Sequence, residues 1–365
     1  MTAHKPRKTY AFIGSYADSK NPGVYTALFD EAKGSFKVTH QTAGLQNPTF
    51  LAVDTDNWRL YALSEGTDAN GQRCGAAGAY QINPDSGQLT PLNQAVTLPA
   101  TTCHITLDRT NQLAMVASYH GGMVGVLPIL EDGKLGETSD IRRHQGASVL
   151  PVQDRPRAHS VTVDRNNRFA VVCDLGLDKV IVYKLDVEGR KLDLHQEVQV
   201  PPGSGPRHLA FHPSYRYAYV INELGSSMTA FAYDEEQGQL APIETVSTLP
   251  GDYQGDNACA DVHISPDGRF LYGSNRGHDS IVVYAIDADN GKLTAMQHES
   301  TGGKHPRNFA LSPDGRFLLV ANKDSNNVVS LARDEATGKL APTGDVLELS
   351  MPVCIKFAQV EADAE

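Results

Sequence analysis

Residues 307–340 read RNFALSPDGRFLLVANKDSNNVVSLARDEATGKL, and this stretch decides the fold because the chain repeats it. Related runs begin at Arg157, Arg207 and Ala260, and two less regular copies begin near Thr49 and Cys103. The repeat recurs about every fifty residues, the spacing of propeller blades. The sequence therefore predicts a β-propeller.

Each repeat divides into four short strands joined by turns. A short apolar segment such as HLAFH, from His208, leads into a Ser-Pro-Asp-Gly turn of the kind seen at 265–268 and 312–315. In such a turn Pro presets φ and Gly accepts a positive φ. The run RFLYGSN from Arg269, the alternating run SIVVYAID from Ser280 and a turn such as DADNGKL follow. Four short strands with regularly spaced turns are typical of one propeller blade.

The two ends of the chain complete a seventh blade. MPVCIKF, from Met351, matches a first strand with no continuation, and YAFIGSY, from Tyr10, matches a second strand with no predecessor. An open β-solenoid or two separate sandwiches would not need complementary ends. We therefore predict an all-β, seven-bladed propeller with four antiparallel strands per blade. One C-terminal strand joins three N-terminal strands to close the ring, and residues 1–365 form one domain.

Composition limits the classes of partner and compartment. The net charge of −11 disfavours nucleic acid and anionic membranes as partners. No apolar run is long enough to span a membrane, and the first residues lack the apolar core of a secretory signal. Five scattered cysteines without a C-x-x-C pair favour free thiols. These features predict a cytoplasmic protein, and ring closure leaves few free strand edges, which favours a monomer or weak dimer.

The blade geometry predicts which residues converge at one mouth of the channel. The innermost strand begins, and the second strand ends, on the same face of the disc. At the start of the innermost strand the repeats place Thr49, Cys103, His159, Arg207, Ala260, Arg307 and Val353. At the end of the second strand they place Ser15, Gly66, Tyr119, Leu175, Glu223, Arg276 and Lys323. A purely structural position would repeat one residue type, so this variation favours a site built from several blades.

These positions suit the chemistry of an anionic substrate. Guanidinium groups bind carboxylate or phosphate and stabilise a developing oxyanion, and Glu223 and His159 can transfer protons or activate water. The candidate catalytic residues are His159, Glu223, Arg207 and Arg276, and the candidate substrate-binding residues are Arg307, Lys323, Tyr119 and His120. The alternative is that these side chains are solvated or form ion pairs between blades.

Other polar residues near the mouth have simpler interpretations. His104 and His208 follow the channel position by one residue, so strand alternation predicts that they point into the blade. A group of amide and acidic side chains recurs just before the end of the second strand: Glu65, Asp174, Asn222, Asn275 and Asn322. It indicates structural turn bonding, or alternatively a ring of oxygen ligands for Ca²⁺.

The motifs PRAHSVT around His159, GPRHLAFHP around Arg207, INELGSS around Glu223 and SNRGHDSI around Arg276 resemble those of a known family. It is the seven-bladed β-propeller lactonase family, which contains bacterial 6-phosphogluconolactonases and fungal carboxymuconate-lactonizing enzymes. The resemblance covers essentially the whole chain. It implies a metal-independent site, without a cofactor, made of His159, Arg207, Glu223 and Arg276.

The resemblance implies hydrolysis of a sugar or phosphosugar lactone, with 6-phosphogluconolactone as the first choice. A carboxymuconate-type cyclisation and a non-catalytic binding scaffold are the alternatives. The partner expected in either reaction is a small anionic lactone or carboxylate. The sequence departs from a typical member at TDANGQRCGAAG, residues 67–78, which predicts an extended loop, and in the long segment from Asp132 to Pro156. Both segments are expected to reshape the mouth of the channel.

Overall fold

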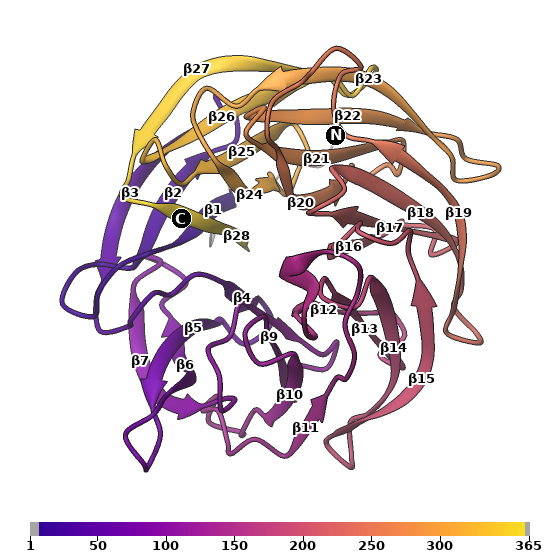
Figure 1. Cartoon of the computed structure of the whole chain (residues 1–365). Coiled ribbons are helices and arrows are strands. Elements are labelled where there is room, and N and C mark those ends of the chain that lie inside the picture. Colours follow the sequence, from indigo (N-terminus) through magenta and orange to yellow (C-terminus); the bar gives the residue numbers. More distant parts are fainter. Residues whose placement is uncertain (1–6, 362–365) are drawn as a thin grey trace.

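The protein is a ring of seven four-stranded antiparallel sheets, as Figure 1 shows. The structure is a computed structural model that describes residues 7–361, so the ends of the predicted domain, residues 1–6 and 362–365, lie outside the described residues. Within residues 7–361 the one helical element is the 3₁₀ turn η1 (Pro151–Gln153), and no helix there has the length and apolar character needed to cross a membrane. The predicted all-β, seven-bladed fold is confirmed.

The strands of each blade follow one another from the channel outward. The closing blade contains β28 (Pro352–Glu361), β1 (Arg7–Ser15), β2 (Val24–Asp30) and β3 (Ser35–Thr42). The next three blades contain β4 (Leu51–Asp54), β5 (Arg59–Thr67), β6 (Arg73–Ile82), β7 (Leu89–Val96); β8 (His104–Leu107), β9 (Leu113–Ser118), β10 (Met123–Pro128), β11 (Asp140–Arg143); and β12 (Ala158–Val163), β13 (Phe169–Asp174), β14 (Lys179–Asp186), β15 (Lys191–Gln199). The last three contain β16 (Pro206–Phe211), β17 (Tyr217–Asn222), β18 (Ser227–Asp234), β19 (Gln239–Ser247); β20 (Ala258–Ile264), β21 (Phe270–Arg276), β22 (Ser280–Ile286), β23 (Leu293–Ser300); and β24 (Pro306–Leu311), β25 (Phe317–Asn322), β26 (Asn327–Arg333), β27 (Leu340–Glu348).

The two chain ends close the ring as predicted. Strand β28 pairs with β1 in an antiparallel ladder that sets Tyr10 opposite Ala358 and Gly14 opposite Cys354. The innermost strands of neighbouring blades contact one another around the whole ring, from β4 and β8 through to β28. The channel is therefore lined by seven first strands, and residues from distant parts of the sequence meet inside it.

Tyrosines on four of the second strands, β1, β5, β17 and β21, tie their blades to a neighbouring blade. The hydroxyl of Tyr219 donates to the carbonyl oxygen of Gly291 at 2.9 Å, and the hydroxyl of Tyr272 donates to that of Gly338 at 2.9 Å. Both glycines lie in the turn between the third and fourth strands of the neighbouring blade, with φ of 72° and 71°. Buried phenolic hydroxyls are thus satisfied at the blade interfaces.

The Ser-Pro-Asp-Gly turns have the conformation that their sequence predicts. Gly268 and Gly315 have φ of 74° and 72°, the left-handed region that favours glycine. The hydroxyl of Ser265 donates to Asp267 at 2.5 Å and accepts the N–H of Phe270 at 3.0 Å. The turn therefore brings the first strand directly into the second.

Both channel histidines differ from the expectation, and for His208 the cause is a bulge at the start of β16. In β16, Pro206 pairs with Asn222 and His208 pairs with Ile221, which leaves Arg207 as the extra residue. A bulge re-aims side chains and breaks strict alternation. His208 therefore lies in the channel beside Arg207, and His104 lines the same part of the channel, so neither histidine points into its blade.

The two long segments of the sequence differ from each other in structure. The predicted loop at residues 67–78 is wrong for residue 67 and for residues 73–78, because β5 and β6 form a long hairpin whose turn is held by Asp68. The segment from Asp132 to Pro156 contains β11 and η1. Buried Gln153 fixes it by donating to the Leu175 carbonyl and to Asp178, both at 2.8 Å.

Candidate active site

A cavity of about 380 Å³ opens at the mouth where the innermost strands begin. Five of the predicted site residues line it: Tyr119, His120, His159, Glu223 and Arg307. The cavity is also lined by Tyr16, Asn47, Thr49, Glu65, Arg73, Thr101, Thr102 and Cys103. The structure thus brings together residues from several blades, as the comparison of the repeats predicted.

Glu223 lies at the centre of a cluster of cations, directly after β17. Its Oε2 atom accepts from Arg207 Nε at 2.8 Å and lies 2.9 Å from Arg276 Nη2. The Nε2 atom of His159 lies 3.9 Å from the same oxygen. Within residues 7–361 no hydrogen-bond donor reaches Oε1. One carboxylate oxygen is therefore anchored, and the other is free to accept a proton or bind water.

The surrounding charges keep Glu223 ionised. Burial raises the pKa of its carboxyl group, but the charges of Arg276, Arg207 and Arg307 and a hydrogen bond from Arg276 lower it by more. The net pKa is below the ordinary glutamate value. The group is consequently a carboxylate throughout the neutral range, available as a base.

Arg207 and Arg276 contact Glu223 but do not themselves line the cavity. The side chains are 2% and 8% exposed. Arg276 also donates to the backbone carbonyls of Ala258 at 3.2 Å and Cys259 at 2.6 Å. Burial and the charges of Arg276 and Arg307 lower the pKa of Arg207 to about 9, so it remains a cation at neutral pH. The geometry of both arginines suits anchoring of Glu223 more than direct contact with a ligand.

Arg307 is the cation that faces the cavity without a carboxylate partner among the described residues. It comes from the start of β24, where it is the extra residue of a bulge between Pro306 and Asn308. Lys323, the other predicted binding cation, does not line the cavity and pairs with Asp324 at 3.0 Å. Its ammonium lies 5.7 Å from the ring centre of Tyr16, which does line the cavity.

His159 is a buried, neutral imidazole. Burial and the nearby charges of Arg207 and Arg307, together with His208, hold its pKa well below the ordinary value. Its Nδ1 atom has no hydrogen-bond partner among residues 7–361. The ring of Tyr119 lies 5.7 Å away, centre to centre, and Arg157 covers that tyrosine at 4.9 Å. His159 is thus held in place mainly by packing.

Sequence reasoning missed a polar wall formed by the long hairpin. Glu65 accepts from Asn47 Nδ2 at 3.0 Å and from Arg73 Nε at 2.8 Å. All three residues line the cavity, and the buried hydroxyl of Thr102 beside them has no partner among the described residues. The sequence carried two signals for this wall: Glu65, one of the recurrent polar side chains, and the departure at residues 67–78, which carries Arg73.

Among the recurrent amide and acidic side chains, the three asparagines form structural bonds, whereas Glu65 lines the cavity. Asn275 and Asn322 donate to the carbonyls of Thr248 and Thr301 at 2.8 and 2.9 Å, and Asn222 donates to Thr229 Oγ1 at 2.9 Å. These bonds agree with the structural interpretation of the repeat. Across residues 7–361 no group of three or more His, Cys, Asp or Glu side chains is arranged to hold a metal ion.

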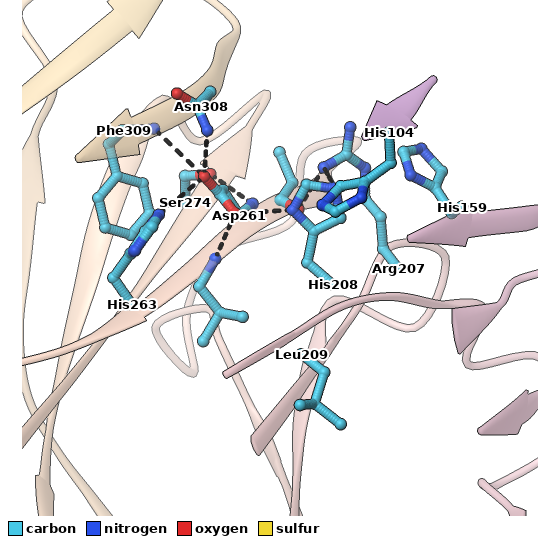
Figure 2. Close-up of polar contacts among 12 residues, drawn as sticks. His104, His159, Arg207, His208, Leu209, Asp261, His263, Ser274, Asn308 and Phe309 are labelled. Carbon is cyan, nitrogen blue, oxygen red and sulfur yellow. Dashed lines mark hydrogen bonds and ion pairs between the residues drawn. The ribbon is translucent and has the colours of Figure 1, made fainter. Parts of the chain in front are cut away.

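A second cavity, of about 520 Å³, occupies the channel beneath the site and opens toward the other mouth. His104, His208, Asp261 and His263 line it. Figure 2 shows Asp261 at the centre of a set of polar contacts that reaches Arg207 through His208. The inside of the channel is thus joined to the cation cluster by hydrogen bonds.

Comparisons with known proteins agree with this architecture. A family model described as "Lactonase, 7-bladed beta-propeller" matches residues 10–357. The chain is 35% identical over 350 residues to the 6-phosphogluconolactonase of Bacillus subtilis, covering 96% of this chain and 98% of the relative. The periplasmic gluconolactonase of Pseudomonas aeruginosa superposes with a TM-score of 0.90 at 33% identity, covering 98% of this chain and 100% of that one. A solved protein of Lactobacillus plantarum superposes with a TM-score of 0.89 at 32% identity, covering 96% and 99%.

Proposed function

Because this chain belongs to the seven-bladed β-propeller lactonase family and is a lactonase, we propose that its substrate is 6-phosphogluconolactone, hydrolysed in the cavity lined by Glu223 and Arg307. The proposal rests on which of the arginines around this cavity already have a carboxylate partner. Arg207 and Arg276 are paired with Glu223, whereas Arg307 has no carboxylate partner among the described residues. One arginine therefore remains for an anionic group of the substrate.

Glu223 is the proposed base. Its free Oε1 takes a proton from water as the water oxygen attacks the lactone carbonyl carbon. The ring C–O bond then breaks, and the ring oxygen takes the proton from Glu223 to become a hydroxyl group, which leaves a carboxylic acid and returns Glu223 to its carboxylate form. The low pKa of Glu223 makes it a weak base, which suffices because lactones are already reactive esters.

Positive charge stabilises the oxyanion that forms in this step. Arg207, Arg276 and Arg307 all lie close enough to Glu223 to lower its pKa, so their combined field also favours negative charge on a substrate bound there. The neutral His159 lines the same cavity, and its Nε2 atom lies 3.9 Å from Glu223 Oε2. It is proposed to contact the substrate by a hydrogen bond and not as a charged group.

The polar wall supports a sugar over an apolar lactone. A carboxylate, an amide and a guanidinium meet at Glu65, Asn47 and Arg73, and such groups accept from and donate to several hydroxyls at once. The aromatic rings of Tyr16 and Tyr119 line the same cavity and offer surfaces for a sugar ring. The name of the Bacillus subtilis relative supports the phosphorylated sugar, and the name of the Pseudomonas aeruginosa protein supports the unphosphorylated one.

The direct test is hydrolysis of freshly made 6-phosphoglucono-δ-lactone and glucono-δ-lactone, each against a blank for spontaneous hydrolysis, with and without EDTA. Preference for the phosphorylated lactone, unchanged by EDTA and lost in Glu223→Gln, is the expected result. Equal or better hydrolysis of glucono-δ-lactone would refute the phosphate requirement. Loss of activity with EDTA would refute the metal-free mechanism.

We also propose a monomer or weak dimer in the cytoplasm. All five cysteines are free thiols, which fits a reducing compartment. Size-exclusion chromatography with light scattering and fractionation of the producing cells test the two parts of this proposal separately.

A further inference from the structure

Asp261 is a buried carboxylate deep in the channel, outside the cavity where the lactone is proposed to bind. Its Oδ1 accepts from His208 Nδ1 at 2.7 Å, and its Oδ2 accepts from His263 Nε2 at 3.1 Å and from the amide of Asn308. Figure 2 shows these contacts converging on the one carboxylate. A buried carboxylate with this many donors holds its neighbours in fixed orientations.

The carboxylate determines which nitrogen of His208 carries the proton. Burial raises the pKa of Asp261, but His263 and His208 lower it by more, so the group is ionised and can only accept hydrogen bonds. The Nδ1 atom of His208 therefore carries a hydrogen. Burial and the charge of Arg207 lower the pKa of His208 to about 4, so its other nitrogen, Nε2, is unprotonated at neutral pH.

The lone pair on Nε2 is directed at the guanidinium of Arg207. Arg207 Nη1 donates to it at 3.2 Å and also donates to the Ala260 carbonyl, while Nε donates to Glu223 at 2.8 Å. The bulge that leaves Arg207 as an extra residue makes this contact between consecutive side chains possible. A continuous hydrogen-bonded chain thus runs from Asp261 through His208 and Arg207 to Glu223.

We propose that Asp261 and His208 are positioning residues, which fix the tautomer of His208 so that it accepts from Arg207 and thereby hold Glu223 in its catalytic orientation. This inference rests on the proposed function, in which Glu223 is the base. It adds two residues that lie outside the substrate cavity and act through Arg207. In the alternative tautomer, with hydrogen on Nε2, His208 Nε2 and Arg207 Nη1 would both be donors. They could not bond, and Arg207 would lose this contact.

The test replaces His208 in two ways. His208→Leu removes the acceptor for Arg207, whereas His208→Gln keeps an oxygen near the position of Nε2. In Asp261→Asn the new amide group can donate to His208 Nδ1, which permits the tautomer of His208 with hydrogen on Nε2. The control is His144→Leu. His144 Nδ1 lies 2.6 Å from Asp174 Oδ2 in a comparable buried pair, and this pair does not contact Arg207.

The first decisive readout is the pKa of Glu223, measured by a ¹³C NMR titration in which Glu223→Gln assigns the signal. The second is the change in kcat compared with the change in KM, measured on the lactone that is hydrolysed fastest. The charged or titratable groups that face Glu223 are Arg207, Arg276, Arg307, His159, Tyr119, Cys103 and Cys259. Those that face His208 are Arg207, His104, His159, Asp261 and Lys356. In His208→Leu and Asp261→Asn we expect the Glu223 pKa to rise by about one unit. We expect kcat to fall about tenfold or more with little change in KM.

His208→Gln should restore both values toward those of the wild type, and His144→Leu should leave both unchanged. A wild-type Glu223 pKa and kcat in folded His208→Leu and Asp261→Asn would overturn the proposal. If His208→Leu does not fold, Asp261→Asn compared with His208→Gln decides the question. The NMR titration needs no substrate, so failure of the positioning chain is distinguishable from failure of the proposed function.

Discussion

Replacing Glu223 by glutamine tests the centre of the proposed site. The change keeps the size of the side chain and removes its charge. In the wild type one oxygen serves both Arg207 and Arg276, at 2.8 and 2.9 Å, and the other oxygen is free. Glutamine offers one acceptor oxygen and an NH₂ group in place of the second. The glutamine oxygen can take the place of Oε2 and accept from both arginines, but the side chain has no negative charge and cannot act as a base.

The expected loss of activity follows from the role of a general base. Such a group contributes about 10²–10⁴-fold in rate, which corresponds to about 3–5 kcal/mol in the activation barrier. The expected loss of stability has a separate cause. Removal of one partner from a buried ion pair costs about 3–5 kcal/mol. The glutamine oxygen retains part of the hydrogen bonding, so we expect the free energy of unfolding to fall by about 1–3 kcal/mol.

Steady-state kinetics and urea unfolding measure the two effects independently. The matched control is Glu197→Gln, since Glu197 pairs with Lys179 at 2.8 Å on the surface with side chains 43% and 29% exposed. An exposed pair of this kind contributes about 0–1 kcal/mol, so activity and stability should be nearly unchanged. Inorganic phosphate should also stabilise Glu223→Gln more than the wild type, because it supplies the missing negative charge. A folded Glu223→Gln protein with kcat within threefold of the wild type would refute the assignment of Glu223 as the base.

Three further predictions follow from the same geometry. Arg307→Ala should raise KM for 6-phosphoglucono-δ-lactone by about 10–100-fold, because a charged hydrogen bond is lost. Parallel assays with glucono-δ-lactone should show a smaller change in KM, and equal changes for both lactones would contradict phosphate binding by Arg307. Truncation after Met351 removes β28 and exposes the inner edge of β1, so thermal unfolding followed by circular dichroism should show a large loss of stability, and an unchanged melting temperature would contradict the closure. The free energy of unfolding should decrease as the pH falls from about 6.5 toward 4. Burial and the charge of Arg207 lower the pKa of His208 from 6.5 to about 4 in the folded protein. In this pH range the unfolded chain therefore takes up a proton on His208 that the folded chain does not. Urea titrations across this range should show a shallower pH dependence in His208→Gln, and an identical dependence would contradict the assignment.

Much of the candidate site could be predicted because its positions are tied to the repeat. Each blade starts and ends its first two strands at equivalent residues, so aligning the repeats placed His159, Glu223 and Arg307 at one mouth, where they line one cavity. The same alignment could not separate Arg307, which faces the cavity, from Arg207 and Arg276, which are buried against Glu223. That difference depends on which carboxylate lies nearest to each guanidinium in three dimensions.

The sequence by itself determined the number of blades, the turn conformations and the closure of the ring. These features depend on local backbone preference and on strand alternation, which every repeat carries. Only the tertiary structure decided that Arg207 is the extra residue of a bulge, that His208 therefore enters the channel, and that the hairpin brings Arg73 to Glu65. The physical reason is that a bulge is set by the pairing of two strands, and an ion pair by the meeting of several segments, so neither is encoded in the pattern of one segment alone.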